Sequence, residues 1–356
     1  MSAQPGPSVD PATGAVTFVV DEDAGVTPAH LWYHLRDFGD DPAFHPRGGH
    51  WVATLPPPPV DRLEYRIVVR EDDGTEAMLL DPRNPHQAPG VFGANSLLEL
   101  PGYRPPEWLG TASPDWRPEP ITVTTAVEGV VVQGDLLTPP GGGPDDPLPL
   151  LVAHDGPEYA RLARLLDYLW WLSTDNPRLR CRALLLQPAD RDLSYAASAT
   201  YTEALVDQAL PRARALAPTV GPVVGLGASL GGLALAHAAA TRPGTFGGLL
   251  CQSGSFFLPR FDAHEQRFRY YDRVVAAVAD LHAAPAALDG VTVALTAGLG
   301  EENLENNRAL EARLRELGVD AGIVEGRDSH NYTAWRDLLH PTLKSLLGGL
   351  WSDPAE

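Results

Sequence analysis

One serine, Ser229, stands where an apolar run meets an alanine-rich helical pattern, with a glycine two residues to either side. The stretch Gly227-Ala228-Ser229-Leu230-Gly231 fits the G-x-S-x-G nucleophile elbow, in which a strand, a sharp turn and a helix present the serine. The glycines are needed because the turn is strained and because strand and helix pass closely. The same stretch is also compatible with a plain helix N-terminus capped by Ser229. The presence of a base and an acid elsewhere in the chain would distinguish a nucleophile elbow from a capped helix start.

The serine of such an elbow is followed along the chain first by an acid and then by a histidine. His330 is the candidate base because it lies between the last predicted strand, 321–325, and the last predicted helix, 335–347. Four further histidines after the serine fall in helical, polar or proline-flanked stretches: His237, His264, His282 and His340.

The acid is expected after the preceding strand, 291–296, where Glu301 and Glu302 both stand. A buried carboxylate there would accept a hydrogen bond from the far ring nitrogen of the base and stabilise the imidazolium. Asp328 is a rival, although a residue two positions from His330 is harder to place on the far side of the ring. The choice between Glu301 and Glu302 stays open.

An oxyanion hole needs two backbone donors. The amide of Leu230, directly after the serine, is the first candidate. The second is expected in the loop after the apolar run 150–153, and Gly156 is our choice there, with Asp155 and Glu158 as alternatives. Pro157 is excluded because proline has no N–H.

These residues follow apolar strands that alternate with helical patterns from position 120 onward. This alternation predicts an α/β fold with a mostly parallel sheet covered on both faces, whose ligands bind beyond the carboxyl ends of the strands. The predicted strands are 122–133, 148–153, 182–186, 222–227, 246–251, 291–296 and 321–325, and the predicted helices are 158–172, 201–217, 230–240, 305–317 and 335–347.

The first 101 residues have a different pattern. After a flexible lead-in over 1–13, short runs of β-forming residues separated by turns predict a small all-β sandwich. The predicted strands are 17–20, 31–35, 51–55, 63–69 and 77–80, the last two joined by a hairpin at Asp72-Asp73-Gly74. Residues 102–119 are rich in proline and tryptophan and predict a stiff linker that packs on a domain. Residues 120–356 form the predicted catalytic domain.

Composition limits the function classes. The 356 residues carry a formal charge of −19, which argues against nucleic acid and anionic membranes as partners. No signal peptide and no transmembrane run is visible, and we expect a cytoplasmic protein with Cys181 and Cys251 as buried thiols. The histidines of the first domain fit no compact metal motif. We expect no metal and no cofactor, and a monomer or homodimer.

Together these motifs resemble the enterochelin (ferric enterobactin) esterase family, within the esterase D-like α/β-hydrolases. The resemblance covers most of the chain and is carried by Gly227–Gly232, Gln252–Phe257, Glu301 with Asn307–Leu310, Gly326–Arg336, the Asp155-Gly156 turn and Leu80–Pro85. It implies an immunoglobulin-like domain before an α/β-hydrolase. It also implies a serine esterase that hydrolyses ester or lactone bonds of a siderophore-like trilactone through an acyl-enzyme.

Two loops depart from that family's pattern, and both border the expected substrate. The family carries Gly-Gly-His-Asp around its base, where this chain has Asp328-Ser329-His330-Asn331, and Arg191-Asp192 replaces the usual Arg and Glu. The residues expected to line the substrate are Arg191, Tyr195, Phe256, Phe257, Trp335 and Arg336.

A ferric tris-catecholate is strongly anionic, and a chain of charge −19 repels it at long range unless local cations reverse the field. A different ester substrate is therefore the alternative: a feruloyl or acetyl ester, a thioester, or a macrolactone or depsipeptide. The second alternative is a catalytically inert binding protein.

Overall fold

The computed structural model describes residues 6–36, 38–39, 42–71, 73–125, 129–283 and 288–351. The chain divides into two compact units. Unit 1 comprises Met1–Arg104 together with two short segments from late in the sequence, Gly298–Glu302 and Gly326–Ala334. Unit 2 comprises Pro105–Ala297, Asn303–Glu325 and Trp335–Glu356. The sequence did not predict that the two short segments would group with the N-terminal region.

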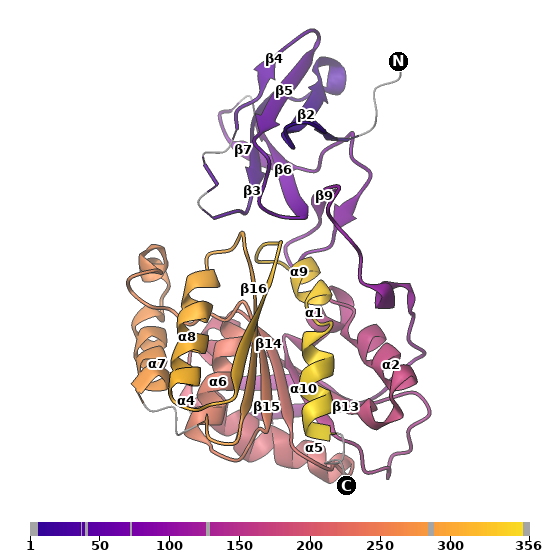
Figure 1. The fold of residues 1–356 in the computed structure, drawn as a ribbon, viewed down its shortest axis with the longest axis vertical. Coiled ribbons are helices and arrows are strands. Elements are labelled where there is room, and N and C mark those ends of the chain that lie inside the picture. Colours follow the sequence, from indigo (N-terminus) through magenta and orange to yellow (C-terminus); the bar gives the residue numbers. More distant parts are fainter. Residues whose placement is uncertain are drawn as a thin grey trace. The chain divides into compact units, whose positions relative to one another are not determined.

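Unit 1 is built from two antiparallel sheets (Figure 1). One sheet has the order β1-β2-β5-β4, with β1 Ser8–Val9, β2 Val16–Asp21, β5 His50–Leu55 and β4 His45–Pro46. The other has the order β3-β6-β9-β8, with β7 paired to β6. Its strands are β3 Pro28–Tyr33, β6 Arg62–Arg70, β7 Glu76–Leu79, β8 Gln87–Ala88 and β9 Asn95–Glu99.

Side-chain alternation explains this arrangement. In β2, Val16, Phe18 and Val20 are buried while the residues between them are partly exposed, as a strand with one covered face requires. Phe18 meets Tyr65 of β6 edge to face, with ring centroids 4.9 Å apart. The predicted all-β region is confirmed.

Two local expectations in unit 1 have different outcomes. The hairpin between β6 and β7 is confirmed, and Gly74 takes φ +84° at its turn; Asp72 lies outside the described residues. The flexible lead-in over 1–13 is wrong for Ser8 and Val9, which pair with Thr17 and Val16. Residues 1–5 lie outside the described residues.

Unit 2 contains an eight-stranded sheet of order β10-β11-β13-β12-β14-β15-β16-β17. Strand β11 pairs antiparallel with both β10 and β13, and the strands from β13 through β16 run parallel. The strands are β10 Arg117–Thr124, β11 Val131–Thr138, β12 Leu150–His154, β13 Arg182–Pro188, β14 Val224–Ala228, β15 Gly248–Gln252, β16 Thr292–Gly298 and β17 Ala321–Gly326.

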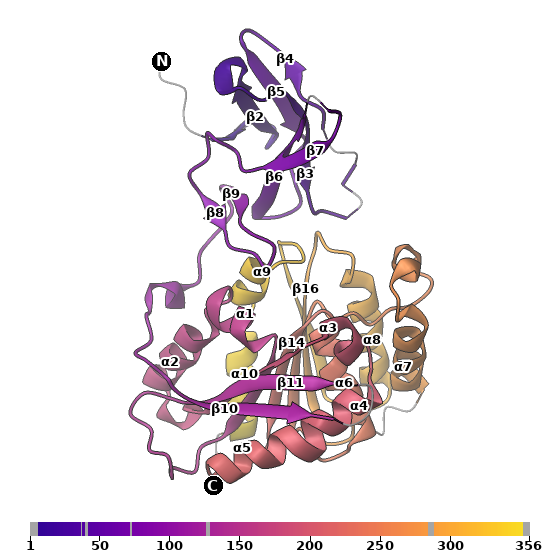
Figure 2. The same ribbon diagram turned by 180° about the vertical axis from the view of Figure 1, so that it is seen from behind.

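Helices cover both faces of this sheet, with α10 on one side and α4 and α5 on the other (Figures 1 and 2). This is why β12, β14 and β15 are buried along their whole length. The helices are α1 Gly156–Arg161, α2 Leu165–Asp175, α3 Arg191–Tyr195, α4 Ala199–Glu203, α5 Leu210–Leu216, α6 Leu230–Thr241, α7 Tyr271–Ala283, α8 Leu304–Glu316, α9 Tyr332–Asp337 and α10 Thr342–Trp351.

Three predicted helices are each interrupted. The helix expected over 158–172 breaks at Arg164, which takes φ 53°. The helix expected over 201–217 contains a π-helical stretch, η4 Ala204–Ala209, just before Pro211, whose missing N–H cannot continue the regular ladder. The helix expected over 335–347 is two helices separated near Pro341.

The predicted linker joins the packing of unit 2. Trp108 lies in the 3₁₀ turn η2 Glu107–Gly110 and is fully buried, with its ring centroid 5.0 Å from that of Tyr168. The cysteine prediction is also confirmed, because Cys181 and Cys251 are free and buried, and burial raises the pKa of each thiol to about 12. Among the described residues, no helix is both long and apolar enough to cross a membrane.

Candidate active site

The predicted elbow is a sharp turn between β14 and α6. Ser229 has φ 53° and ψ −127°, a combination that side-chain-bearing residues adopt rarely. Backbone hydrogen bonds hold it there: its N–H donates to the Gln252 carbonyl over 2.9 Å, and its carbonyl accepts from the Gly232 and Ser255 amides over 3.1 Å each. This strain is of the kind found at nucleophile elbows, not at ordinary capped helix starts.

The flanking glycines are required by close backbone approach. A Cβ on Gly227 would lie 2.6 Å from the carbonyl carbon and oxygen of Gly231. A Cβ on Gly231 would lie 3.2 Å from the His154 Cβ, and one on Gly232 would lie 3.1 Å from the Gly227 oxygen. Strand and helix therefore pass each other at backbone contact, as the sequence pattern predicted.

A second serine contacts the first. The Ser229 Oγ lies 3.1 Å from the Ser255 Oγ, so the two hydroxyls share a hydrogen bond. The segment that carries Ser255 is fixed by Asn307, whose side chain accepts from the Gly254 amide and donates to the Gly254 carbonyl. The sequence analysis did not identify Ser255 as a site residue.

A buried neutral histidine, His154, contacts the backbone that follows the serine turn. Burial lowers the pKa of His154 to about 3, so the ring is uncharged at neutral pH. Its Nδ1 lies 2.9 Å from the Gly231 carbonyl and its Nε2 lies 2.8 Å from the Tyr201 hydroxyl. A neutral ring satisfies both partners when Nδ1–H donates to the carbonyl and Nε2 accepts from the phenol. The imidazole also stacks on Tyr195, with centroids 4.6 Å apart.

The three amides considered as second oxyanion donor differ in their surroundings. The Asp155 amide donates to the Tyr195 hydroxyl over 3.1 Å and is already engaged. Gly156 begins α1, and a Cβ there would lie 2.4 Å from the Leu185 Cα, so only glycine fits. The preceding Asp155 takes φ 48°, and its carboxylate accepts from Arg191 over 2.8 to 3.0 Å. With the Asp155 amide engaged, Gly156 and Glu158 are left as candidates, and Gly156 stays our prediction.

Unit 1 carries the predicted base and both candidate acids. The His330 Nδ1 lies 3.4 Å from Glu302 Oε1, and both side chains are mostly buried. The other carboxylate oxygen of Glu302 lies 3.5 Å from His34 Nε2. Glu301 is 2 % exposed, and the rival Asp328 accepts hydrogen bonds from Nε and Nη2 of Arg62. The 3.4 Å contact with the His330 Nδ1 makes Glu302 our candidate for the acid, and the assignment stays a prediction.

The residues expected to line the substrate are mostly engaged elsewhere. The four aromatic members are each less than 10 % exposed: Tyr195, Phe256, Phe257 and Trp335. The Trp335 indole N–H donates to Ser253 Oγ over 2.8 Å, which ties it to the loop after β15. Arg191 bonds Asp155, and the Arg336 Nε donates to Asp337 over 2.7 Å. Their roles toward a substrate stay predictions.

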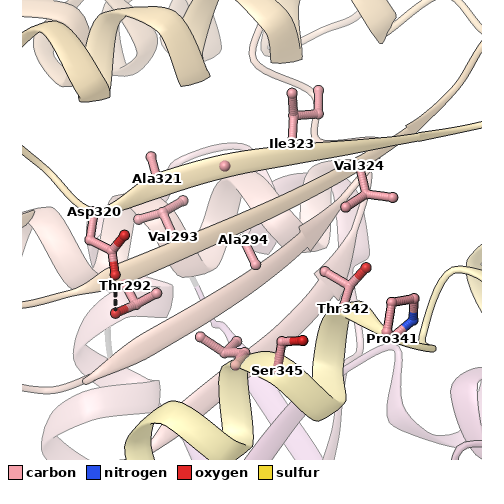
Figure 3. A pocket seen from close by; sticks show the side chains of 12 residues that line it. Thr292, Val293, Ala294, Asp320, Ala321, Ile323, Val324, Pro341, Thr342 and Ser345 are labelled. Carbon is pink, nitrogen blue, oxygen red and sulfur yellow. Dashed lines mark hydrogen bonds between the residues drawn. The ribbon is translucent and has the colours of Figure 1, made fainter.

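A groove of about 350 Å³ lies elsewhere in unit 2, between α10, β16 and the edge strand β17 (Figure 3). Its wall is largely apolar, and at one end Thr292 donates to Asp320 over 3.0 Å. None of the predicted catalytic residues lines it. The groove is therefore separate from the residues predicted to carry the chemistry.

A mostly parallel sheet with helices on both faces and a strained serine directly after a central strand defines an α/β-hydrolase fold, here preceded by an all-β region. Residues 190–346 match the "Putative esterase" family model.

The resemblance to the enterochelin esterases is confirmed. The chain is 26 % identical over 322 residues to an iron(III) enterobactin esterase of Escherichia coli, covering 85 % of this chain and 74 % of that protein. The enterobactin esterase of Shigella flexneri, solved in the presence of enterobactin, has a similar fold with a TM-score of 0.77 at 22 % identity, covering 98 % of this chain and 97 % of that one. The ferric enterobactin esterase of Salmonella typhimurium gives the same TM-score and coverage at 21 % identity.

Proposed function

We propose that this protein is a serine esterase of enterobactin-like trilactone siderophores, acting through an acyl-enzyme. The observation that carries the proposal is Ser229, held in a strained turn where a Cβ on Gly227 would clash with the Gly231 backbone at 2.6 Å. A family-model match and similarity to enterobactin esterases support ester bonds as the target. Two free, buried cysteines fit a reducing compartment, and we propose the cytoplasm.

In the proposed first half-reaction, His330 takes the Ser229 Oγ proton as that oxygen attacks the lactone carbonyl carbon. Glu302, 3.4 Å from the His330 Nδ1, stabilises the imidazolium that forms. The amides of Leu230 and Gly156 donate to the oxyanion. Collapse of the tetrahedral intermediate breaks the ester C–O bond, and His330 returns its proton to the departing alkoxide.

In the second half-reaction His330 removes a proton from water, and the resulting hydroxide attacks the acyl carbon of the Ser229 ester. Collapse breaks the bond to Ser229 Oγ, which recovers the proton from His330. The product is a carboxylic acid, and the enzyme returns to its starting state. No cofactor is needed for this sequence.

Fluorophosphonate labelling tests the nucleophile. The wild type should label at one site, Ser229→Ala should not label, and Ser345→Ala, whose serine lines the groove of Figure 3, should label like the wild type. Equal labelling of the wild type and Ser229→Ala would refute the mechanism.

Product analysis tests the substrate. Iron-free and ferric enterobactin and a panel of simple aryl esters should be compared, with 2,3-dihydroxybenzoyl-serine products followed by mass spectrometry. The proposal predicts a higher kcat/KM for a trilactone than for any aryl ester. Because the chain carries a charge of −19, we expect the anionic ferric complex to gain in kcat/KM as salt is raised from 20 to 200 mM. Turnover of aryl esters alone would contradict the siderophore assignment.

A further inference from the structure

We propose that strand β6 of the N-terminal sandwich positions the base, with Arg62 and Glu64 as positioning residues for His330. This inference rests on the proposed function. The observation behind it is that segment Gly326–Ala334, which contains His330, belongs to unit 1 and is bonded to the first residues of β6 and the residue before it.

The contacts lie on both sides of His330 in the sequence. Two residues before it, Asp328 accepts two hydrogen bonds on Oδ2, from Nε of Arg62 at 2.9 Å and from Nη2. Three residues after it, the Thr333 hydroxyl donates to Glu64 Oε1 over 2.6 Å. Arg62 and Glu64 are two positions apart on one strand, so their side chains share a face of the sheet. One strand face therefore holds the base loop at two points.

A backbone hydrogen bond holds the base loop to the sandwich at a third position. The Asp61 amide donates to the Arg327 carbonyl over 2.7 Å, and the Arg327 side chain returns a bond to the Asp61 carboxylate over 2.8 Å. The Arg327 side chain is half exposed, whereas the Arg62 side chain is 2 % exposed and its partner Asp328 is 9 % exposed. Removing one partner of a buried ion pair destabilises the fold much more than removing one partner of an exposed pair, because the remaining partner becomes a buried uncompensated charge.

The segment that carries Glu302 is held by the same unit. Nη1 of Arg36 donates to the Glu302 carbonyl over 2.5 Å. Gly300 is packed so closely that a Cβ would meet Leu35 at 2.7 Å and Val60 at 3.0 Å. Base and acid are thus both fixed by side chains of the sandwich, which gives this region a task in catalysis rather than in recognition alone.

Asp328 also organises the loop itself. Its second oxygen, Oδ1, accepts from the Ser329 amide over 2.9 Å. Asn331, on the other side of the histidine, accepts on its side chain from the Ala334 amide over 2.7 Å. A displacement of Asp328 therefore transmits to the backbone on which His330 is carried. Arg62 acts through this carboxylate, which it holds by two hydrogen bonds.

The test is an Arg62 series assayed at saturating and subsaturating ester. Arg62→Lys keeps the charge but has one nitrogen in place of the two that donate to Asp328 Oδ2. We expect kcat to fall about tenfold. Arg62→Gln is too short to hold Asp328, and kcat should fall about 100-fold, the loss typical of a misplacement of about 1 Å. KM should stay within about twofold, because a buried side chain that binds no substrate contributes no substrate affinity.

A paired variant separates positioning from stability. Arg62→Gln combined with Asp328→Asn removes both charges, so the Tm should recover toward the wild-type value while kcat stays about 100-fold low. Arg83→Gln is the control: Arg83 is an arginine of the sandwich whose side chain is 16 % exposed and paired with Asp21 over 3.0 Å. Its kcat should be that of the wild type.

Thr333→Val probes the other side of the loop without removing a charged side chain. It removes the hydroxyl that lies 2.6 Å from Glu64 Oε1 and 2.7 Å from Asn331 Oδ1, and kcat should fall about tenfold at unchanged KM. This variant keeps the proposal testable where Arg62→Gln does not fold.

Three results would overturn the proposal: recovery of kcat together with Tm in the paired variant, a wild-type kcat in both Arg62→Gln and Thr333→Val, or a raised KM at constant kcat in the Arg62 series. The Ser229→Ala result is independent of these. If Ser229→Ala retains esterase activity, the proposed function fails, whereas an inactive Ser229→Ala beside fully active Arg62 variants refutes only the positioning role.

Discussion

Replacement of Gly227 by alanine tests whether the elbow is set by backbone packing. An added Cβ would lie 2.6 Å from the carbonyl carbon and oxygen of Gly231 and 2.9 Å from the Gly232 nitrogen. Cβ atoms essentially never approach other heavy atoms within 3.0 Å, so the turn between β14 and α6 must open by several tenths of an ångström. All three obstructing atoms belong to the backbone, so no side-chain rotation relieves the clash.

The cost follows from that displacement. Overpacking of a well-packed interior typically destabilises by about 1–3 kcal/mol. A shift of about 1 Å at the attacking oxygen lowers the rate by about 100-fold. We therefore expect Gly227→Ala to fold with a lower Tm and to hydrolyse 4-nitrophenyl butyrate with a kcat up to about 100-fold below that of the wild type.

Gly322→Ala is the matched control, because Gly322 lies in β17 and a Cβ there would meet nothing within 4 Å. Its Tm and kcat should equal those of the wild type. Circular dichroism would give the Tm and initial rates would give kcat. A Gly227→Ala protein with a wild-type kcat would show that the helix does not pass the strand as closely as the structure has it.

Three further predictions concern the supporting residues. Because the pKa of His154 is about 3 in the folded chain and near 6.5 when unfolded, the unfolded state binds the extra proton between these values. Stability should therefore fall as pH drops below 6.5, by about 2 kcal/mol at pH 5, and a urea titration should show no such contribution in His154→Gln. Glu302→Gln should lower kcat by about 100-fold or more, while Glu301→Gln should retain most of its kcat; the reverse order in ester assays would reassign the acid. Tyr195→Phe leaves the buried Asp155 amide without its acceptor and should cost about 1–3 kcal/mol in chemical denaturation.

Much of the serine side of the site could be predicted because its determinants are local in sequence. The Gly-x-Ser-x-Gly spacing encodes a strand, a strained turn and a helix within a few residues, and the structure has Ser229 at φ 53° between β14 and α6. Gly156 was chosen from the sequence, and a contact that spacing alone does not reveal supports that choice, because the Asp155 amide donates to Tyr195, 40 positions away.

For the base and the acid, the sequence predicted only the order in which they follow the serine and the strands after which they lie. His330 and the two glutamates were located by their place after strands, but the sequence did not choose between Glu301 and Glu302. Our preference for Glu302 rests on a 3.4 Å contact with His330 in the folded chain. Arg62 carried no signal in the sequence, because an arginine at the start of a strand is ordinarily exposed. Its burial depends on Asp328, 266 positions later.

The two sides should therefore respond differently to substitution. At the elbow the obstructing atoms are backbone atoms, so no second substitution can restore space lost to a Cβ on Gly227. At the base loop the contact is a pair of side chains, Arg62 and Asp328, and a pair can be exchanged for another of matched length and charge. A reversed pair, Arg62→Asp with Asp328→Arg, keeps the charge balance but loses the Oδ1 bond to the Ser329 amide. It should restore stability more fully than activity, since the fold needs only a compensated charge whereas the base needs that particular loop conformation.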